Sequence, residues 1–396
     1  MQSEIKININ KKSRKQIIKK NLNIKTIVIS VVILIFTFFV FIYLNILFTK
    51  YEKYEIISKE YITNQNITNE QISYFEFKNG IVRYSYDGVS FINSFFKTEW
   101  FVAYDFKNLI IDVSENYFVI SNYFGNEIIV FNENGITGRN YTEYNIDRVK
   151  ISDNGYLYVL LNDNYTSYIN VYDNTFEKLH ISIKSLLSGD GLATDIDVSN
   201  DGTELCVNYS YIDTNKLKTK VVYYNFGEIG KFSNPKRIVG IFENGDDFVG
   251  SINFFDNNNS QFICEDSINF VSTKILTSPK ITNSYLFDNI LSFTNSNDYF
   301  AVVISELGNK KLIIFDKTGK KLSTINIDIQ YDDFYITKDI IVFINKNRII
   351  GISTFGKIKF DIFFNDDIYY VHKKNSFFYN ELIVATNNYI QNVILK

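Results

Sequence analysis

The sequence predicts an all-β fold, a β-propeller of about eight (alternatively seven) four-stranded blades, preceded by one transmembrane helix. Three observations support this prediction. An uncharged apolar run covers residues 26–49, a pattern of short strands and polar turns recurs eight times between residue 74 and the end, and the copies begin 34 to 56 residues apart. Repetition at about this period is typical of propeller blades. With 396 residues, 46% of them hydrophobic, the chain can bury a large core.

Residues 1–25 form a basic tail, with Glu4 as the one acidic residue. Its cations are Lys6, Lys11, Lys12, Arg14, Lys15, Lys19, Lys20 and Lys25. Such a cluster next to a membrane span favours a cytoplasmic N-terminus, which would place the rest of the chain outside the membrane. A tail of this kind can also bind anionic lipid or nucleic acid. A topological role is favoured because the tail is short and contains no aromatic residues.

The uncharged run from Thr26 to Thr49 predicts a membrane-spanning helix, with Lys25 before it and Lys50 after it. As a helix it would be roughly 36 Å long, which exceeds the hydrocarbon core of about 30 Å. A buried core helix would be shorter or amphipathic. The apolar region of a cleaved signal peptide is about 7 to 15 residues long and ends in small residues. We therefore expect a permanent single-pass anchor in the cell membrane.

Residues 50–71 are polar and show little strand patterning, so they predict a juxtamembrane stalk. The last copy of the repeat has only three apparent strands, and its fourth must come from elsewhere in the chain. Tyr54 to Ser58, YEIIS, is a candidate for this closing strand and would give eight blades. If Tyr74 to Phe77 closes the ring instead, the number of blades is seven.

Residues 72–396 are predicted to form the extracytoplasmic propeller. The repeat is clearest in IDVSENYFVISNYFGNEIIVFNENG, from Ile111 to Gly135, and in the next copy Asn154-Gly155 is a strong hairpin signal. The eight copies begin at Tyr74, Ile111, Val149, Ile196, Ile252, Ile290, Phe334 and Ile368. A single blade cannot bury both faces of its sheet, so neighbouring blades must stack and the ring must close. Two consecutive β-sandwich domains are the alternative, but sandwiches do not normally repeat one pattern eight times.

Several segments carry a resemblance to a known family. They are the basic tail with its single span, GIVRYSYDGVSFI (80–92) with Trp100 after it, NEIIVFNENG (126–135), IDVSNDGTELCVNYSYIDTNKLKTKVVYYNFGEIG (196–230) and KLIIFDKTGKKL (311–322). In this order they resemble the membrane-anchored β-propellers of low-GC Gram-positive bacteria that are filed as a domain of unknown function. The resemblance covers nearly the whole chain and implies WD40-like or quinoprotein-like repeats. It implies no catalytic residues.

The histidines and cysteines show no catalytic or metal-binding spacing. His180 and His372 lie in different repeats without a zinc motif, so both are interpreted as surface or loop histidines. Cys206 and Cys264 fall in the second strands of adjacent copies. Equivalent positions in neighbouring blades usually lie beyond the reach of a disulfide, so two separate buried thiols are expected.

The carboxylates are too numerous for their presence alone to indicate a catalytic or metal-binding site. Asp112 and Asp197 occupy the same place in the two IDVS copies, which predicts a repeated structural hydrogen bond and not a catalytic pair. Residues 256–267 start like a calcium loop but lack the required Gly and Glu, so an EF-hand is rejected. Three pairs lie between strands, as solvated loop charges or at one mouth of the ring: Asp246-Asp247, Asp332-Asp333 and Asp366-Asp367.

Two propeller chemistries can be compared with the sequence. Quinoprotein dehydrogenases stack Trp-rich motifs through most blades, whereas this chain has one tryptophan, Trp100. Glycosidases need two carboxylates at a defined separation, and the sequence places no such pair. Trp100 is a speculative ligand contact as a sugar-stacking platform, although a role in blade packing is favoured. No catalytic, cofactor-binding or metal-binding residue is assigned.

The predicted function is therefore that of a membrane-tethered scaffold that binds a protein of the cell envelope, without cofactor. Removing the tail's charge of +7 from the chain's −3 leaves about −10, so a nucleic-acid partner is not expected. The alternative is binding or hydrolysis of a small ligand or glycan at the propeller channel. Specificity is expected in the segments that break the repeat, Tyr211 to Lys220 and His180 to Thr194.

Overall fold

The computed structural model describes residues 24–62, 72–233, 235–243, 247–374 and 380–396. The chain divides into two units, Met1–Thr49 and Lys50–Lys396. In the first unit, helix α1 covers Ile24–Phe48. Among the described residues, no helix is long and apolar enough to cross a membrane. The predicted topological cations Lys11, Lys12, Arg14, Lys15, Lys19 and Lys20 lie outside the described residues, as do the side chains of Lys25 and Thr26.

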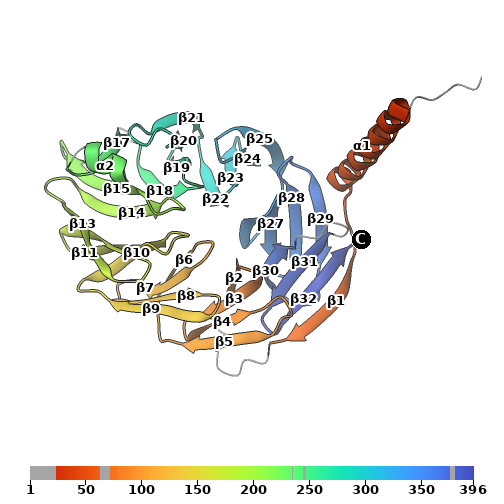
Figure 1. Cartoon of the computed structure of the whole chain (residues 1–396), viewed down its shortest axis with the longest axis horizontal. Helices are drawn as coiled ribbons and strands as arrows, with labels where there is room; N and C mark the ends of the chain where they lie inside the picture. Colours follow the sequence, from red (N-terminus) through yellow and green to blue (C-terminus); the bar gives the residue numbers. More distant parts are fainter. Residues whose placement is uncertain (1–23, 63–71, 234, 244–246, 375–379) are drawn as a thin grey trace, which may run out of the picture. The chain divides into compact units, whose positions relative to one another are not determined.

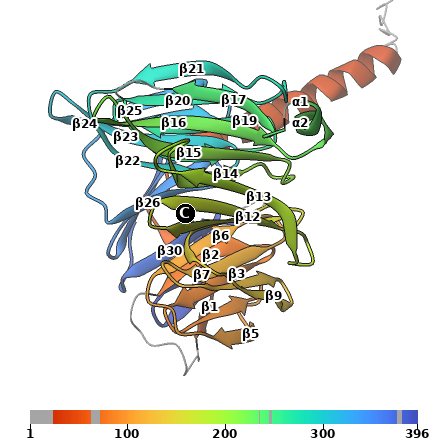
Figure 2. The ribbon, with the colours of Figure 1, turned by 90° about the vertical axis from the view of Figure 1, so that its left-hand side faces the viewer.

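The second unit is a ring of eight four-stranded antiparallel sheets, as Figures 1 and 2 show. The strands of blade 1 are β2 (Ser73–Phe77), β3 (Gly80–Ser85), β4 (Gly88–Ile92) and β5 (Thr98–Ala103). Blade 2 contains β6 (Leu109–Val113), β7 (Phe118–Asn122), β8 (Glu127–Asn132) and β9 (Gly135–Tyr141). Blade 3 contains β10 (Asn145–Ile151), β11 (Leu157–Asp163), β12 (Thr166–Tyr172) and β13 (Lys178–Leu186). Blade 4 contains β14 (Leu192–Val198), β15 (Glu204–Asp213), β16 (Lys216–Asn225) and β17 (Ile238–Glu243), with helix α2 (Glu228–Ser233) before β17.

The remaining blades repeat this order. Blade 5 contains β18 (Val249–Phe254), β19 (Asn259–Cys264), β20 (Ser267–Ser272) and β21 (Lys280–Leu286). Blade 6 contains β22 (Ile290–Asn295), β23 (Tyr299–Glu306), β24 (Asn309–Asp316) and β25 (Lys321–Ile327). Blade 7 contains β26 (Asp333–Thr337), β27 (Ile340–Asn345), β28 (Arg348–Ser353) and β29 (Ile358–Phe363). Blade 8 contains β30 (Ile368–Lys373), β31 (Glu381–Thr386), β32 (Tyr389–Leu395) and β1 (Tyr54–Tyr61).

The closing strand confirms eight blades over seven. Strand β1 pairs antiparallel with β32, from Tyr54 opposite Leu395 to Tyr61 opposite Tyr389. The predicted candidate, Tyr54 to Ser58, is therefore the start of the closing strand. Residues 54–61 therefore belong to the ring. Local sequence patterns do not reveal this strand, because most of β1 is exposed and its paired residues in β32 are at least 328 positions away.

The repeat predicted from the sequence corresponds to one blade per copy. All eight predicted starts lie on the innermost strands, β2, β6, β10, β14, β18, β22, β26 and β30. The Asn154-Gly155 hairpin joins β10 to β11, and Gly155 adopts φ +85°, which glycine tolerates best. Eight apolar clusters of described residues lie between neighbouring blades. Stacking of the blades against one another therefore builds the core.

A β-bulge recurs in the innermost strand of blades 3, 4, 5, 6 and 8. In blade 3 it lies between Ile146 and Arg148, and in blade 4 between Ala193 and Asp195. A bulge adds a residue to one strand, increases its twist and redirects the side chains that follow. Arg148 and Asp195 follow their bulges directly and both line the channel. The bulges thus place charged side chains in the middle of the ring.

Candidate functional site

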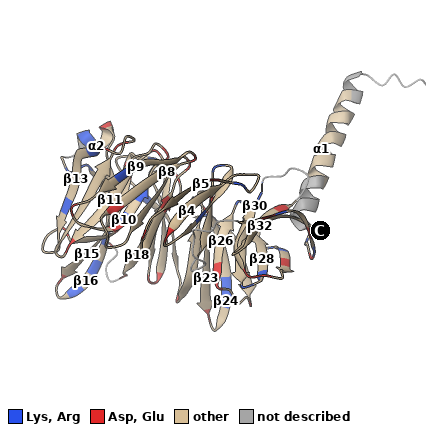
Figure 3. Cartoon of the chain, turned by 90° about the horizontal axis from the view of Figure 1, so that it is seen from below, with Lys and Arg blue, Asp and Glu red and all other residues tan. Residues whose placement is uncertain are grey.

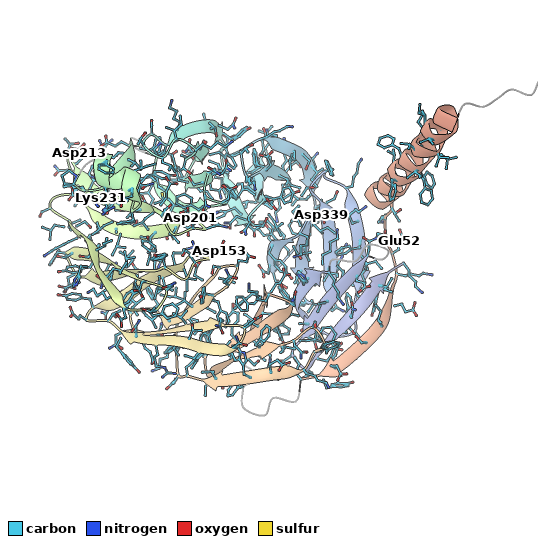
Figure 4. All side chains as sticks on the ribbon, viewed as in Figure 1. Glu52, Asp153, Asp201, Asp213, Lys231 and Asp339 are labelled. Atoms are coloured by element: carbon cyan, nitrogen blue, oxygen red, sulfur yellow. The ribbon has the colours of Figure 1, made fainter. Side chains whose placement is uncertain are left out.

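The first candidate site is the channel on the side of blades 2, 3 and 4. The turns beside it carry Asp153 and Asp201, which Figure 4 shows toward the centre of the ring. A cavity of about 740 Å³ at this position is lined by the ends of β6, β10, β14 and β18 and by turns of blades 1, 6 and 7. A smaller cavity of about 260 Å³ is lined by Arg148, Lys150, Asp195 and Gln261, among others. The channel wall is therefore polar and charged.

One charged triad follows directly from the repeat. Asp112, Lys150 and Asp197 occupy equivalent positions near the ends of β6, β10 and β14. The Lys150 ammonium lies 3.2 Å from Asp112 Oδ1 and 3.0 Å from Asp197 Oδ1. We call these three residues the channel triad. A single cation thus links two carboxylates from the blades on either side of it.

Each aspartate of the channel triad also accepts a backbone hydrogen bond from the next blade. The Ile151 amide donates to Asp112 Oδ2 at 2.8 Å, and the Phe254 amide donates to Asp197 Oδ2 at 2.5 Å. Ile151 and Phe254 both end an innermost strand. The predicted repeated hydrogen bond is confirmed, and it joins consecutive blades. This use of both oxygens explains why the two aspartates recur in IDVS.

Burial shifts the pKa values of the charged side chains that line the channel. Burial raises the pKa of Asp112, an effect that Lys150 opposes. Burial alone would lower the pKa of Lys150, but the neighbouring Asp112 and Asp197 outweigh it and raise that pKa. Burial also raises the pKa of Asp195 to about 6, against the opposing effects of Lys150, the Ile252 amide and Arg148. Asp195 therefore titrates close to neutral pH.

A second charged cluster lies across the channel, in blades 1, 7 and 8. Glu76 Oε1 lies 3.1 Å from the Lys338 ammonium and 3.2 Å from His372 Nε2. His372 Nδ1 is 3.2 Å from Thr337 Oγ1. Burial lowers the pKa of His372. The interpretation of His372 as a surface or loop residue is wrong, because it lies buried on the innermost strand β30 and not on a turn.

The second candidate site is a groove between the outer strands of blades 3 and 4, with a volume of about 510 Å³. Residues 180–185 of β13 form one wall. The floor comes from β15 and β16, where Tyr209, Val222 and Tyr224 line the groove and the two tyrosine hydroxyls lie 2.9 Å apart. The basic residues of its lining are His180, Lys184, Lys220, Lys236 and Arg237. We call this feature the blade 3–4 groove.

The surface around the blade 3–4 groove concentrates the repeat-breaking segments. Strands β15 and β16 have 10 residues each and β13 has 9, more than any other strand of the ring. Figure 3 shows basic residues on β13, β16 and α2, and Figure 4 places Asp213 and Lys231 at the outer edge of this region. Sequence reasoning identified the two segments, 211–220 and 180–194, but not that they flank one groove.

The other residues singled out by sequence have structural contacts. Trp100, on the outer strand β5, stacks on Phe131 with ring centroids 5.6 Å apart and donates from Nε1 to the Glu133 carbonyl at 2.9 Å. These contacts lie between blades 1 and 2, away from the residues that line the channel cavities. Packing between blades accounts for them. Cys206 and Cys264 are both buried and form no disulfide, as predicted.

The paired loop aspartates mostly stabilise their own blades. Asp332 Oδ2 accepts from the Lys346 amide at 3.1 Å, and Asp247 Oδ2 accepts from Ser267 Oγ at 2.7 Å. Both contacts tie the entry of a blade to its central hairpin. Asp366 similarly accepts from the Tyr389 hydroxyl in blade 8. Asp333 lines a channel cavity of about 600 Å³, and Asp246 lies outside the described residues.

Solved structures of other proteins are similar to this chain. The structure described as the Dos1 propeller is 13% identical, with a TM-score of 0.51, and the match covers 88% of this chain and 96% of that one. BamB from Moraxella catarrhalis is 12% identical, with a TM-score of 0.49, over 87% of this chain and 100% of that one. At such identity the likeness concerns the fold alone. A search of curated protein sequences finds no match.

A protein family provides the remaining comparison. Its sequence profile matches residues 48–395, which include every strand of the ring. The match confirms the resemblance to proteins filed under an unknown function. The chain belongs to the family described as "Family of unknown function (DUF5711)".

Proposed function

We propose that this protein is a membrane-tethered, extracytoplasmic β-propeller of a low-GC Gram-positive bacterium that binds a protein partner as a scaffold at the cell envelope. The observation that carries the proposal is the blade 3–4 groove. Its apolar floor and basic rim offer both the desolvated contacts and the charge that a protein interface uses. The support for the tether is the uncharged run 26–49 with the basic tail before it.

The charge of the groove differs from that of the domain. The chain after the tail carries about −10, whereas the described lining of the groove has five basic residues and one carboxylate, Asp190. None of the five forms an ion pair with a described carboxylate. An acidic surface on a partner protein would be complementary to the basic lining of the groove.

Two experiments test the proposal. Protease added to intact cells should degrade residues 50–396 and spare the N-terminal tail, whereas protection of the propeller would contradict the topology. Crosslinking in membranes, followed by purification of the full chain, should recover a stoichiometric envelope protein. Recovery of no such protein would contradict the scaffold role.

The second candidate function is binding of a small polar ligand or glycan in the channel. The specific observation in its favour is the charged 740 Å³ cavity beside the channel triad. Gln261 adds an acceptor in the smaller cavity of about 260 Å³, because its Oε1 is buried without a hydrogen-bond partner in the described structure. A glycan panel that raises the melting temperature of the full chain, combined with the absence of any crosslinked protein, would favour this function over the scaffold.

A further inference from the structure

We propose that the blade 3–4 groove binds an extended acidic segment of the partner protein as a fifth strand added to β13. This inference rests on the proposed scaffold function and specifies its binding mode. Strand addition to an exposed sheet edge supplies affinity through backbone hydrogen bonds and specificity through alternate side chains. Three features of the groove support it: the orientation of β13, the composition of the floor and the charge of the rim.

The edge of β13, and not one of its faces, forms the wall of the groove. Six consecutive residues, 180–185, line it. Successive side chains of a strand point to opposite faces, so a wall formed by one face would include only alternate residues. The even positions His180, Ser182 and Lys184 are exposed, whereas Ile181 and Ile183 pack against the core between blades 3 and 4. Both sets line the groove because the backbone edge between them faces it.

This edge has no strand partner among the described residues. Strand β13 is the last strand of its sheet and pairs with β12 alone. Its six lining residues span roughly 20 Å, enough for a short added strand. Edge strands expose unpaired amides and carbonyls that readily pair with another chain. The groove therefore offers a row of backbone donors and acceptors next to an apolar surface.

The floor is suited to every second side chain of an added strand. Lys220, Val222, Tyr224 and Phe226 follow one another at a spacing of two along β16 and its end, so they share the face turned toward β13. The Tyr209 and Tyr224 hydroxyls form a hydrogen bond with each other there. An apolar side chain of the added strand would thus meet a largely apolar surface.

The basic side chains of the rim favour acidic residues at the other alternate positions of the added strand. Lys184 and Lys236 lie on opposite sides of the groove, one on β13 and one in the connection before β17. The Arg237 guanidinium donates to the Phe226 carbonyl at 2.9 Å, which fixes a charge beside the floor. A segment that alternates apolar and acidic residues would complement both floor and rim. A polyanion without a peptide backbone would match the charge alone.

The test uses the full chain in detergent micelles and a fluorescent decapeptide of alternating Glu and Val. Binding is measured by anisotropy, with a Lys/Val peptide as the charge control. The same Glu/Val peptide with every second amide N-methylated is the backbone control, because it keeps the charge and loses strand pairing. Hydrogen exchange of the 178–186 segment reports whether β13 gains a partner. Polyglycerol phosphate serves as a polyanion that cannot form a strand.

Strand addition predicts binding of the Glu/Val peptide, slower exchange over 178–186, and little binding of either control peptide. The double variant Lys184→Glu/Lys236→Glu should bind at least about tenfold more weakly, because like charges at an interface repel. The matched variant Lys280→Glu/Lys321→Glu, on the outer strands of blades 5 and 6, should bind within about twofold of the original chain.

Three results would overturn the inference. They are equal binding of the N-methylated peptide, unchanged exchange over 178–186 in the bound state, and binding of polyglycerol phosphate without binding of the Glu/Val peptide. Each leaves the scaffold proposal standing if membrane crosslinking still recovers a stoichiometric partner protein. Recovery of no partner contradicts the scaffold itself. The two proposals therefore fail separately.

Discussion

The channel triad and the blade 3–4 groove use charge in opposite ways. In the channel, Lys150 lies between Asp112 and Asp197 at 3.2 and 3.0 Å, so the charges of three consecutive blades are satisfied by one another. In the groove, the basic residues have no described carboxylate within ion-pair distance, although they surround an apolar floor. In the channel, where the repeat is regular, charged side chains link neighbouring blades. In the groove, where the repeat is interrupted, charged side chains remain available to a partner protein.

This difference follows from how each region is built. Equivalent positions of neighbouring innermost strands approach one another around the channel, so a single Asp-Lys-Asp alternation is enough to pair them. The outer strands diverge from one another, and a longer β13 and a longer β15–β16 hairpin add surface that no neighbouring blade covers. The comparison predicts that channel substitutions affect stability, whereas rim substitutions affect binding.

The largest stability effect is expected for Lys150→Met. This variant leaves two largely buried carboxylates without their common cation, and breaking a buried pair from one side costs about 3 to 5 kcal/mol. The melting temperature of the full chain measures it. Arg139→Met removes the more exposed pair with Glu127 and should cost less than about 1 kcal/mol. Equal losses in the two variants would contradict the structural role of the channel triad.

A pH-dependent effect is expected from Asp195. Its pKa of about 6 in the folded chain lies above the ordinary 3.8, so its ionised form opposes folding above pH 6 and this penalty disappears as the pH falls. The penalty at pH 7 is at most about 3 kcal/mol. Asp195→Asn keeps an acceptor for the Ile252 amide and should raise the melting temperature at pH 7.5 but much less at pH 4.5. A pH-independent difference between the two chains would contradict this assignment.

A smaller loss is expected from the floor of the groove. Tyr224→Phe removes the 2.9 Å hydroxyl contact with Tyr209 and leaves a buried hydroxyl with fewer partners. The expected cost is about 1 to 2 kcal/mol, measured as a lower melting temperature. Tyr165→Phe removes an exposed hydroxyl on the β11–β12 turn and is the control. An unchanged melting temperature in Tyr224→Phe would show that the pair contributes little.

The smallest stability effect is expected for the rim. Lys236→Glu changes an exposed side chain and should shift stability by no more than about 0.5 kcal/mol. The same variant should reduce the amount of partner recovered by membrane crosslinking several-fold, because it reverses a charge at the proposed interface. If Lys236→Glu is destabilised but still recovers its partner normally, the distinction between a stabilising channel and a binding groove is wrong.

Local sequence was sufficient to predict the blades. The alternation and spacing of the strands place all eight copy starts on innermost strands, and IDVS led to the correct structural interpretation of Asp112 and Asp197. The prediction that Tyr54 to Ser58 closes the ring is confirmed as well. These features succeed because a strand's face pattern and the repeat period are properties of the chain itself.

The sites depend on contacts between residues far apart in the chain. His372 seemed a surface residue because nothing near it in sequence shows that Glu76, almost 300 positions earlier, lies 3.2 Å away. Lys150 was not identified because in its own copy it reads as an ordinary strand lysine. Its position matching Asp112 and Asp197 was the available signal.

By itself, the sequence determined the class of fold, the number of repeats and the strands within them, because periodic burial is encoded residue by residue. Only the tertiary structure decided which charges meet across the channel and which segments enclose the blade 3–4 groove. Closing the ring brings residues tens to hundreds of positions apart to within hydrogen-bond distance. Such distances depend on the stacking and bulging of all eight blades together.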